Sequence, residues 1–370
     1  MPNSPSQPEN RRDFLTGKAL RRRMEQAGEA IADHLLDVDG NRLPSAGPTV
    51  RLATDAMACE FSVIMNPGPV ENVSIASDAL EMLQPLEEQM SAYQPSSEIS
   101  QLNAIASAEK VQIKENLFQL LLQCKKLSDE TAGAFDATSG PLIALWRQCR
   151  QAGNIPSQKE INDCLQQTGM QHIVFDEETS SVQFDCGGVE LNLGGIGKGY
   201  ALDCLSYFLQ DNGMAEHLVH GGQSSLLAKG DHHQQGGWPI SIRNPLFTEK
   251  KLATILMRDQ ALATSGSNVQ FFRHAGKRYG HILDPRTGYP VHNLLSVTVL
   301  APSAAIADGL STAFFVLGLE KTLEYCHNQK EIGVLLVPPP LKGRQLEPVV
   351  YGIPQEFLFA TSEDVHLQYL

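Results

Sequence analysis

The segment Leu193-Gly-Gly-Ile-Gly-Lys-Gly-Tyr200, "LGGIGKGY", contains four glycines and one lysine in eight residues. Two short segments rich in strand-forming residues, Ser181–Asp185 and Val189–Leu193, precede it and are separated by Cys-Gly-Gly. Strand-forming segments joined by glycines are typical of a β-hairpin. We therefore expect the glycine-rich segment to follow directly from a β-strand.

A helix is expected after the glycines. Ala201, Leu205, Phe208 and Leu209 recur at helical spacing before Gly213, which predicts a helix over 199–211. The free N–H groups at a helix N-terminus attract anions, and residues without side chains let a ligand approach closely. The segment is thus a candidate phosphate loop. The alternative, a glycine turn that packs helix on strand and binds nothing, stays open on this segment alone.

Two common phosphate-binding patterns do not match the segment. A P-loop would need glycine at position 192 and Ser or Thr at position 199, but the chain has Asn192 and Gly199. A dinucleotide fingerprint, G-x-G-x-x-G, fits Gly195 and Gly197 but meets Tyr200 at its third glycine. The loop therefore belongs to neither class.

Composition limits the kinds of protein this can be. The chain has 370 residues, of which 42% are hydrophobic and 19% charged, and a formal net charge of −13. These values are typical of a globular protein, and the acidic balance argues against nucleic acid as a partner. Seven cysteines are scattered singly, without zinc spacing or a disulfide framework, which favours a reducing compartment such as the cytoplasm. No apolar run is long enough to span a membrane.

The N-terminal residues 1–47 are expected to form a polar tail with one amphipathic helix at about 18–36. Asn10-Arg-Arg-Asp-Phe-Leu15 is similar to the core of a twin-arginine export signal, but a charged segment follows where an apolar region is required. A cytoplasmic location is therefore favoured, and export stays open. A Gly- and Pro-containing linker ending at Pro48 separates this tail from one large domain over 48–370.

The remaining chain alternates irregularly between strand and helix patterns, and several strands follow one another through short Gly or Asp turns. This order predicts an α+β fold, a single large domain with largely antiparallel or mixed sheets and flanking helices. Helices are expected at about 74–89, 115–132, 141–151, 157–167, 199–211, 303–317 and 320–328. Strands are expected at 51–52 continuing into 60–65, 172–176, 181–185, 189–193, 217–219, 224–228, 239–243, 252–258, 261–264, 278–283, 294–300 and 333–337.

Asp308 and Thr312 are four residues apart in the predicted helix 303–317, so they share one face of it. A carboxylate and a hydroxyl are hard oxygen ligands of the kind that Mg²⁺ takes. The alternative is a helical aspartate that bonds a nearby hydroxyl or faces solvent.

His281 lies at the end of a predicted strand, before the turn Asp284-Pro-Arg-Thr-Gly288. A histidine near an aspartate can act as a general base near neutral pH, and Asp284 is three residues away. A structural His–Asp pair beside a turn is the alternative.

A third group of residues lies upstream. Tyr93 and Phe135 could stack on a flat ring, and Asp136 could accept a hydrogen bond from that ring or from a ribose. The alternative is that these are core aromatics beside turns.

In this order, these segments resemble one family, the flavin transferases that move FMN from FAD to a protein threonine or serine (ApbE-type, formerly called thiamine-biosynthesis lipoproteins). The resemblance covers nearly all of 49–320. It rests on eight separated motifs: MACEFSV (57–63), MSAYQPSSEISQLN (90–103), GAFDATSGPL (133–142), LNLGGIGKGYALD (191–203), ALATSGS (261–267), GHILDPRTGYP (280–290), SVTVLAP (296–302) and ADGLSTAFFVLG (307–318).

The resemblance implies a role for each matching residue. It implies FAD contacts at Met57, Tyr93, Ala134, Phe135, Asp136, Asn192, Lys198 and Leu283. It implies magnesium ligands at Gly195, through its carbonyl, and at Asp308 and Thr312, with Ser311 where some relatives carry a second metal-side aspartate. It implies that His281, oriented or relayed through Asp284, takes a proton during transfer. Asn192 departs from the usual aspartate, and Ala58-Cys59 from a common Gly-Thr.

The implied activity is Mg²⁺-dependent transfer of FMN from FAD to a Thr or Ser hydroxyl of an acceptor flavoprotein, with release of AMP. An FAD pyrophosphatase without a protein acceptor is one alternative. A non-catalytic FAD-binding or carrier protein is the alternative from another class.

Overall fold

The structure is a computed structural model that describes residues 47–267, 271–360 and 365–370. The expected N-terminal amphipathic helix lies outside these residues. The helices are α3 (Glu71–Glu81), α4 (Leu83–Met90), α5 (Glu98–Ile105), α6 (Glu115–Glu130), α7 (Gly140–Ala152), α8 (Gln158–Leu165), α9 (Gly197–Asp211) and α10 (Ala304–His327), with 3-10 turns η1 (Met170–His172) and η2 (Gln355–Phe357). None of the helices within the described residues is long and apolar enough to cross a membrane.

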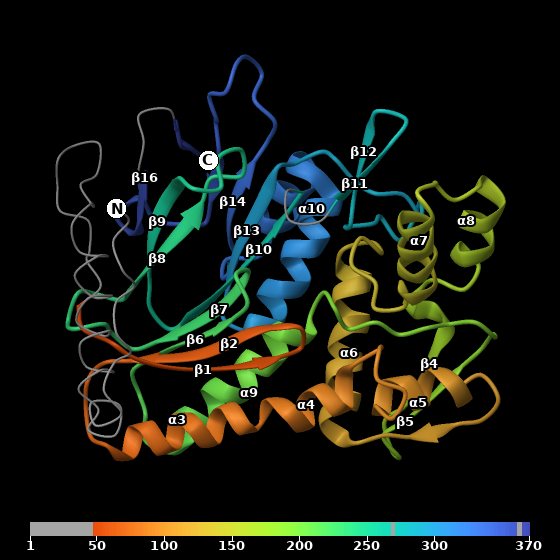
Figure 1. The fold of residues 1–370 in the computed structure, drawn as a ribbon, viewed down its shortest axis with the longest axis horizontal. Helices are drawn as coiled ribbons and strands as arrows, with labels where there is room; N and C mark the ends of the chain where they lie inside the picture. Colours follow the sequence, from red (N-terminus) through yellow and green to blue (C-terminus); the bar gives the residue numbers. More distant parts are fainter. Residues whose placement is uncertain (1–46, 268–270, 361–364) are drawn as a thin grey trace, which may run out of the picture.

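A nine-stranded sheet forms the centre of the molecule (Figure 1). Its neighbouring strands pair antiparallel except for the last two, which are parallel. This arrangement confirms the prediction of a mixed, largely antiparallel α+β fold. In spatial order the strands are β1 (Val50–Ala56), β2 (Cys59–Met65), β6 (His217–Gly221), β7 (Ser225–Lys229), β10 (Gln260–Gly266), β13 (Ser296–Ala301), β14 (Gly333–Val337), β15 (Val349–Tyr351) and β17 (Gln368–Tyr369).

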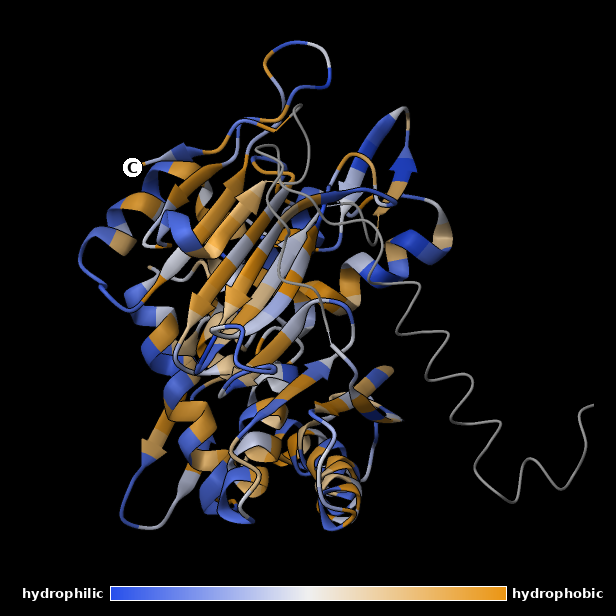
Figure 2. Cartoon of the chain, turned by 90° about the vertical axis from the view of Figure 1, so that its left-hand side faces the viewer, coloured by the Kyte–Doolittle hydropathy of each residue, from blue (hydrophilic) through white to orange (hydrophobic). Residues whose placement is uncertain are grey.

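The two faces of this sheet are both apolar and supply two different cores. Successive strand residues point to opposite faces, and neighbours such as Leu262 and Ala263, or Val334 and Leu335, accordingly fall in different buried clusters. One cluster includes the inner sides of α9 and α10. The other joins the sheet to a second one made of β16 (Leu358–Ala360), β9 (Lys251–Met257) and β8 (Trp238–Arg243). The hydrophobic residues of the central strands are plain in Figure 2.

A helical lobe containing α5 to α8 lies beside these layers (Figure 1). It includes a small sheet of β3 (Val111–Gln112), β5 (Ser181–Phe184) and β4 (Ile173–Asp176). Near α7, a separate hairpin of β11 (Phe271–His274) and β12 (Lys277–Gly280) projects from the molecule.

The predicted hairpin of 181–185 with 189–193 is wrong. Strand β5 lies between β3 and β4, so both of its edges are already paired. The chain after it forms only one isolated bridge, between Glu190 and Ser139. The Asn103 side chain takes the place of a strand partner, since it accepts from the Leu191 N–H at 2.8 Å and donates to the Leu191 carbonyl at 3.0 Å.

Most of the helices predicted from sequence periodicity are present. The two segments expected at 303–317 and 320–328 correspond to α10, which is kinked at Gly318, with a φ of 77°. The segment 74–89 forms two helices that meet at Met82 rather than one. Helix α5 and the strands β3, β11, β15, β16 and β17 were not predicted.

Candidate active site

The N-terminal end of α9 lies against the first turn of α10. A Cβ atom added to Gly199 would lie only 2.1 Å from the Ala304 carbonyl oxygen. Since no side chain fits there, this glycine is required for close helix packing. Gly199 is therefore a glycine because of the close contact between α9 and α10. The same contact brings the glycine loop next to Asp308.

Asp308 is the centre of the site. The residue is almost buried, with 5% exposure. The Gly199 N–H donates to its Oδ2 at 3.1 Å, and the Ser225 hydroxyl donates to its Oδ1 at 2.9 Å. The Lys198 Nζ lies 3.5 Å from Oδ2. Burial of a carboxylate is costly unless charge and hydrogen bonds compensate it, and this site provides both.

Thr312 lies one helical turn beyond Asp308, facing the glycine loop. Its Oγ1 would be 3.5 Å from a Cβ placed on Gly195. A buried carboxylate and a hydroxyl are both hard oxygen donors, which is the donor chemistry that Mg²⁺ prefers. The residues at this position therefore fit a magnesium ion.

Ser311 does not share this arrangement. Its side chain is 1% exposed. The Ser311 hydroxyl pairs with the Ser265 hydroxyl at 2.9 Å and donates to the Asp308 carbonyl at 2.9 Å. These bonds direct it into the packing between α10 and β10, so its assignment as a metal ligand is not supported.

A cavity of about 330 Å³ opens beside the glycine loop. Its lining includes Lys198 and Asn192 of the glycine loop, together with Met57 and Tyr93. Met57 and Ala58 form the two-residue turn between β1 and β2, with φ of 50° and 58°. Positive φ is strained for residues with a side chain and is frequent at functional sites. The Glu87 carboxylate holds this turn by accepting from the Met57 N–H at 2.8 Å.

Tyr93 lies where three cavities adjoin, because it lines the one beside the glycine loop and two neighbours. Tyr93 is 64% exposed. The Arg147 guanidinium lies 5.2 Å from the ring centroid, and the Asn192 amide donates to the phenol oxygen at 3.4 Å. An exposed aromatic ring in a groove suits stacking on a planar ligand.

The segment 134–136 packs behind the glycine loop and does not line the cavity beside it. Ala134 and Phe135 are 1% and 4% exposed, and the Phe135 ring lies under Gly195 and Gly309. Stacking of this ring on a ligand is therefore not supported. The Asp136 carboxylate accepts from the Thr138 N–H, the Thr138 hydroxyl and the Met170 N–H. Burial raises the pKa of Asp136, while these hydrogen bonds oppose the rise.

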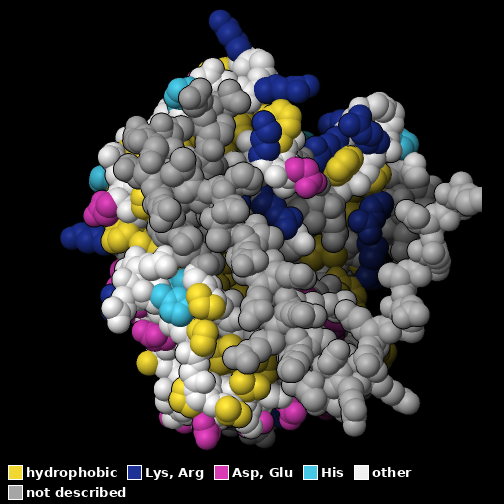
Figure 3. All heavy atoms as spheres, turned by 60° about the vertical axis from the view of Figure 1, so that its left-hand side comes forward, with side chains coloured by type: hydrophobic (Ala, Val, Ile, Leu, Met, Phe, Trp, Pro, Cys, Tyr) yellow, Lys and Arg dark blue, Asp and Glu magenta, His cyan; other side chains and the backbone are white. Residues whose placement is uncertain are grey.

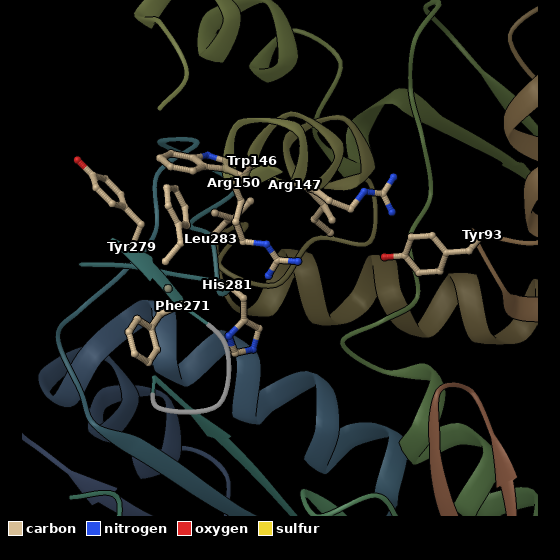
Figure 4. A pocket seen from close by; sticks show the side chains of 11 residues that line it. Tyr93, Trp146, Arg147, Arg150, Phe271, Tyr279, His281 and Leu283 are labelled. Carbon is tan, nitrogen blue, oxygen red and sulfur yellow. The ribbon is translucent and has the colours of Figure 1, made fainter. Parts of the chain in front are cut away.

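His281 lies in a neighbouring cavity of about 220 Å³, formed between α7 and the β11–β12 hairpin. In Figure 4, the side chains of His281 and Arg150 both point into this cavity, and Tyr93 lies across it. The His281 side chain is exposed, whereas Leu283 is 8% exposed and forms part of the wall. The histidine and the flavin neighbour expected from the sequence thus lie in one cavity.

Asp284 is bound to Arg286. Its Oδ1 accepts from the Arg286 Nε at 2.8 Å, and its Oδ2 accepts from the Arg286 guanidinium at 2.8 Å. The Asp284 Oδ1 also accepts from the Arg286 backbone N–H at 3.0 Å. Both carboxylate oxygens are therefore used within the turn, which favours a role in shaping it over a role in relaying a proton from His281.

Several residues of the site were not identified from the sequence. Ser225 orients Asp308, Ser265 pairs with Ser311, and Glu87 holds the Met57 turn. Arg147 and Arg150 line the cavity of His281. None of them has a periodic or motif signal of its own. Only Ser265 lies within one of the family motifs, ALATSGS (261–267).

Comparison with known proteins gives consistent matches. A family model described as the ApbE family matches residues 56–336. The FAD:protein FMN transferase of Vibrio cholerae is 31% identical over 295 residues, which are 78% of this chain and 87% of that protein. The protein of the same name from Salmonella typhimurium is 34% identical over 241 residues, 64% of this chain and 69% of its own.

Solved structures agree in fold. The flavin transferase ApbE from Vibrio cholerae superimposes with a TM-score of 0.71 at 28% identity, covering 82% of this chain and 96% of that one. The ApbE protein from Thermotoga maritima gives a TM-score of 0.72 at 29% identity, covering 78% and 94%. Since the family model spans most of the chain and includes Asp308, Thr312, Lys198 and His281, the chain belongs to the ApbE family.

Proposed function

We propose that this chain transfers FMN from FAD to a threonine or serine hydroxyl of an acceptor protein, with Mg²⁺, and releases AMP. Its similarity to proteins named FAD:protein FMN transferase supports the reaction. The single structural observation that carries the proposal is the buried Asp308 carboxylate, held by Gly199 and Ser225 with Lys198 at its side. This oxygen-rich position adjoins a cavity at a helix N-terminus, which suits a diphosphate.

Asp308, Thr312 and the Gly195 carbonyl would hold the metal ion in this proposal. When bound, Mg²⁺ supplies neutralisation of the negative charge on the diphosphate. Lys198 would add a positive charge on the same side, and the N–H groups at the start of α9 would face the phosphate oxygens. The ring of Tyr93 and the Met57 turn would bind flat parts of FAD in the adjoining cavity.

His281 is the proposed general base. It would take the proton of the acceptor hydroxyl as that oxygen attacks the phosphorus on the FMN side. A new phosphoester bond forms to the acceptor, the bridging P–O bond breaks, and AMP leaves with the bridging oxygen. Asp284 and Arg286 would hold the turn that follows His281, so we assign Asp284 a positioning role.

Because His281 is exposed, water can also reach it. An FAD pyrophosphatase activity would then use the same residues, with a water molecule in place of the acceptor hydroxyl. Release of AMP without modification of any acceptor would indicate this second activity.

The test compares His281→Ala and Asp308→Asn with the unmodified chain. We expect His281→Ala to keep its affinity for FAD and to lose transfer by about 10²- to 10⁴-fold, the usual contribution of a general base. Asp308→Asn should lose both transfer and its response to added Mg²⁺. FAD affinity is measured by quenching of flavin fluorescence, and transfer by release of AMP in the presence of acceptor. Wild-type transfer by His281→Ala would exclude the assigned base, and binding of FAD without AMP release by the unmodified chain would indicate a carrier protein.

A further inference from the structure

The hairpin β11–β12 beside His281 carries basic residues and no acidic ones. Between Asp259 and Asp284 the sequence contains no Asp or Glu, whereas Arg273, Lys277 and Arg278 all lie on this hairpin. The whole chain has a net charge of −13. The hairpin β11–β12 is therefore locally positive, whereas the chain as a whole is negative.

The strand register places like charges opposite each other. Arg273 pairs with Arg278. Like charges directly opposite on neighbouring strands are destabilising. Burial and the charge of Arg273 both lower the pKa of Arg278. Burial, Lys277 and Arg278 lower the pKa of the nearby His292. The positive charges of the hairpin thus repel one another, and an anionic partner bound beside them would reduce this repulsion.

Two more arginines lie across the cavity. Arg147 and Arg150 of α7 both line this cavity and are exposed. In Figure 4, Arg150 points toward His281 and Arg147 points toward Tyr93. No carboxylate lines this cavity among the described residues. We call Arg147, Arg150, Arg273 and Lys277 the basic rim. Within the part of the chain that the structure describes, none of the four forms an ion pair with an acidic residue. Figure 3 shows Lys and Arg side chains gathered in the upper part of one face.

Exposed aromatic rings accompany these charges. Phe271 is 43% exposed and Tyr93 is 64% exposed, and both line the cavity of His281. The Arg278 guanidinium lies 3.9 Å from the centroid of the Phe271 ring. Aromatic residues and arginines dominate the binding energy of protein interfaces, so the composition suits a protein partner.

We propose that the basic rim docks the acceptor protein through an acidic segment that flanks the target hydroxyl. This inference rests on the proposed transferase activity, because it names the partner of that site. Arg147 and Arg150 line the cavity of His281, which is where the acceptor hydroxyl must arrive. Arg273 and Lys277 lie on the hairpin that forms another wall of this cavity through Phe271, Phe272, Tyr279 and Gly280. The glycine loop and Lys198 line the adjoining cavity instead, and Arg273 and Lys277 line neither cavity. They lie at the hairpin tip, where they can meet a protein but not the diphosphate.

The experiment uses two fluorescein-labelled synthetic peptides and the full chain. One peptide carries a single threonine between aspartates, and the other has asparagine in place of each aspartate. Binding is measured by fluorescence anisotropy, and transfer by peptide mass after incubation with FAD and Mg²⁺. The variant is Arg273→Glu/Lys277→Glu. The matched control is Lys321→Glu/Lys330→Glu, which makes the same change of charge at exposed positions of α10 and the loop after it.

We expect the aspartate peptide to bind about tenfold more tightly than the asparagine peptide, and added salt to reduce the difference. The hairpin variant should lose this preference while its Kd for FAD stays unchanged, and the control variant should keep it. Equal binding of the two peptides, or an equal loss in both variants, would overturn the docking proposal. A weakened Kd for FAD in the hairpin variant would also overturn it, since the hairpin would then bind the nucleotide.

The two proposals fail in different ways. Preferential binding of the aspartate peptide with no mass gain by either peptide would support the basic rim and count against the transferase. Equal mass gain by both peptides, with equal binding, would support the transferase and exclude the acidic segment as the docking determinant.

Discussion

Gly199 shows that one residue can serve packing and chemistry together. The missing side chain lets α9 approach the Ala304 carbonyl, and the backbone N–H of the same residue then donates to the Asp308 carboxylate. A glycine loop can thus contribute to a site through helix packing, without matching a known phosphate pattern.

We expect Gly199→Ala to destabilise the fold by about 2 kcal/mol or more, because its Cβ would overlap backbone that cannot move aside cheaply. Gly187→Ala is the matched control, since a Cβ there meets nothing within 4 Å. Urea unfolding measures both. Equal stability of the two variants would show that α9 and α10 are not packed as closely as described.

Ser225→Ala removes one of the hydrogen bonds that orient the Asp308 carboxylate. We expect the affinity for Mn²⁺, as a substitute for Mg²⁺, to fall by about tenfold, which is typical when a group supporting a metal ligand is lost. Titration followed by electron paramagnetic resonance measures binding without turnover. Ser241→Ala, an exposed serine on β8, is the control. Unchanged Mn²⁺ affinity in Ser225→Ala would argue against Asp308 as a ligand.

Residue spacing predicted which side chains share a helix face, but it did not predict which side chains are buried. Asp308 and Thr312 share a helix face, which follows from helical periodicity, and Lys198 joins Asp308 through the close packing of α9 on α10. Ser311 and Phe135 were expected to face a ligand but are buried. Which side of a residue becomes buried depends on the elements packed against it, and sequence spacing does not contain that information.

At the scale of elements, α9 is anchored to β6 through His217. This histidine is fully buried, its Nδ1 lies 2.9 Å from the Met214 carbonyl, and the Ser206 hydroxyl lies 2.9 Å from its Nε2. Burial lowers the pKa of His217 to about 4. Between pH 6.5 and 4, His217 is therefore mostly neutral in the native state and mostly protonated in the unfolded state.

This difference predicts acid sensitivity. The contribution of His217 to stability is fully present above its ordinary pKa of 6.5 and is lost as pH falls from there toward 4. The variant His217→Asn has no titratable group at this position. As pH falls from 6.5 to 4, its free energy of unfolding should therefore decrease by roughly 3 kcal/mol less than that of the unmodified chain. Urea unfolding at several pH values measures the difference. Parallel pH profiles would contradict the lowered pKa.

Elements with a local signal were predictable, and elements defined by distant contacts were not. The kink in α10 falls at Gly318, between the two helices expected there. The hairpin expected at 181–193 fails because β3 and β4 take both edges of β5 and Asn103 satisfies the Leu191 backbone. Those partners are up to 88 residues away in sequence.

At the scale of the whole molecule, the fold class followed from the order of strands and helices, but the strand order did not. The central sheet places β10 between β7 and β13, and the second sheet joins β16 to β9. These neighbours are set by packing of the two apolar faces. This arrangement brings together three features that are far apart in sequence. They are the glycine loop, the Met57 turn and His281, which line adjoining cavities.

The transfer of FMN to a protein hydroxyl is the activity that the whole arrangement of the site is proposed to serve. The most direct measurement is the intact mass of a candidate acceptor with an exposed threonine, after incubation with the purified chain, FAD and Mg²⁺. We expect a mass gain of one FMN, an equal amount of AMP, and loss of both when EDTA is added. An unmodified acceptor with FAD left intact on the chain would contradict the proposed transfer.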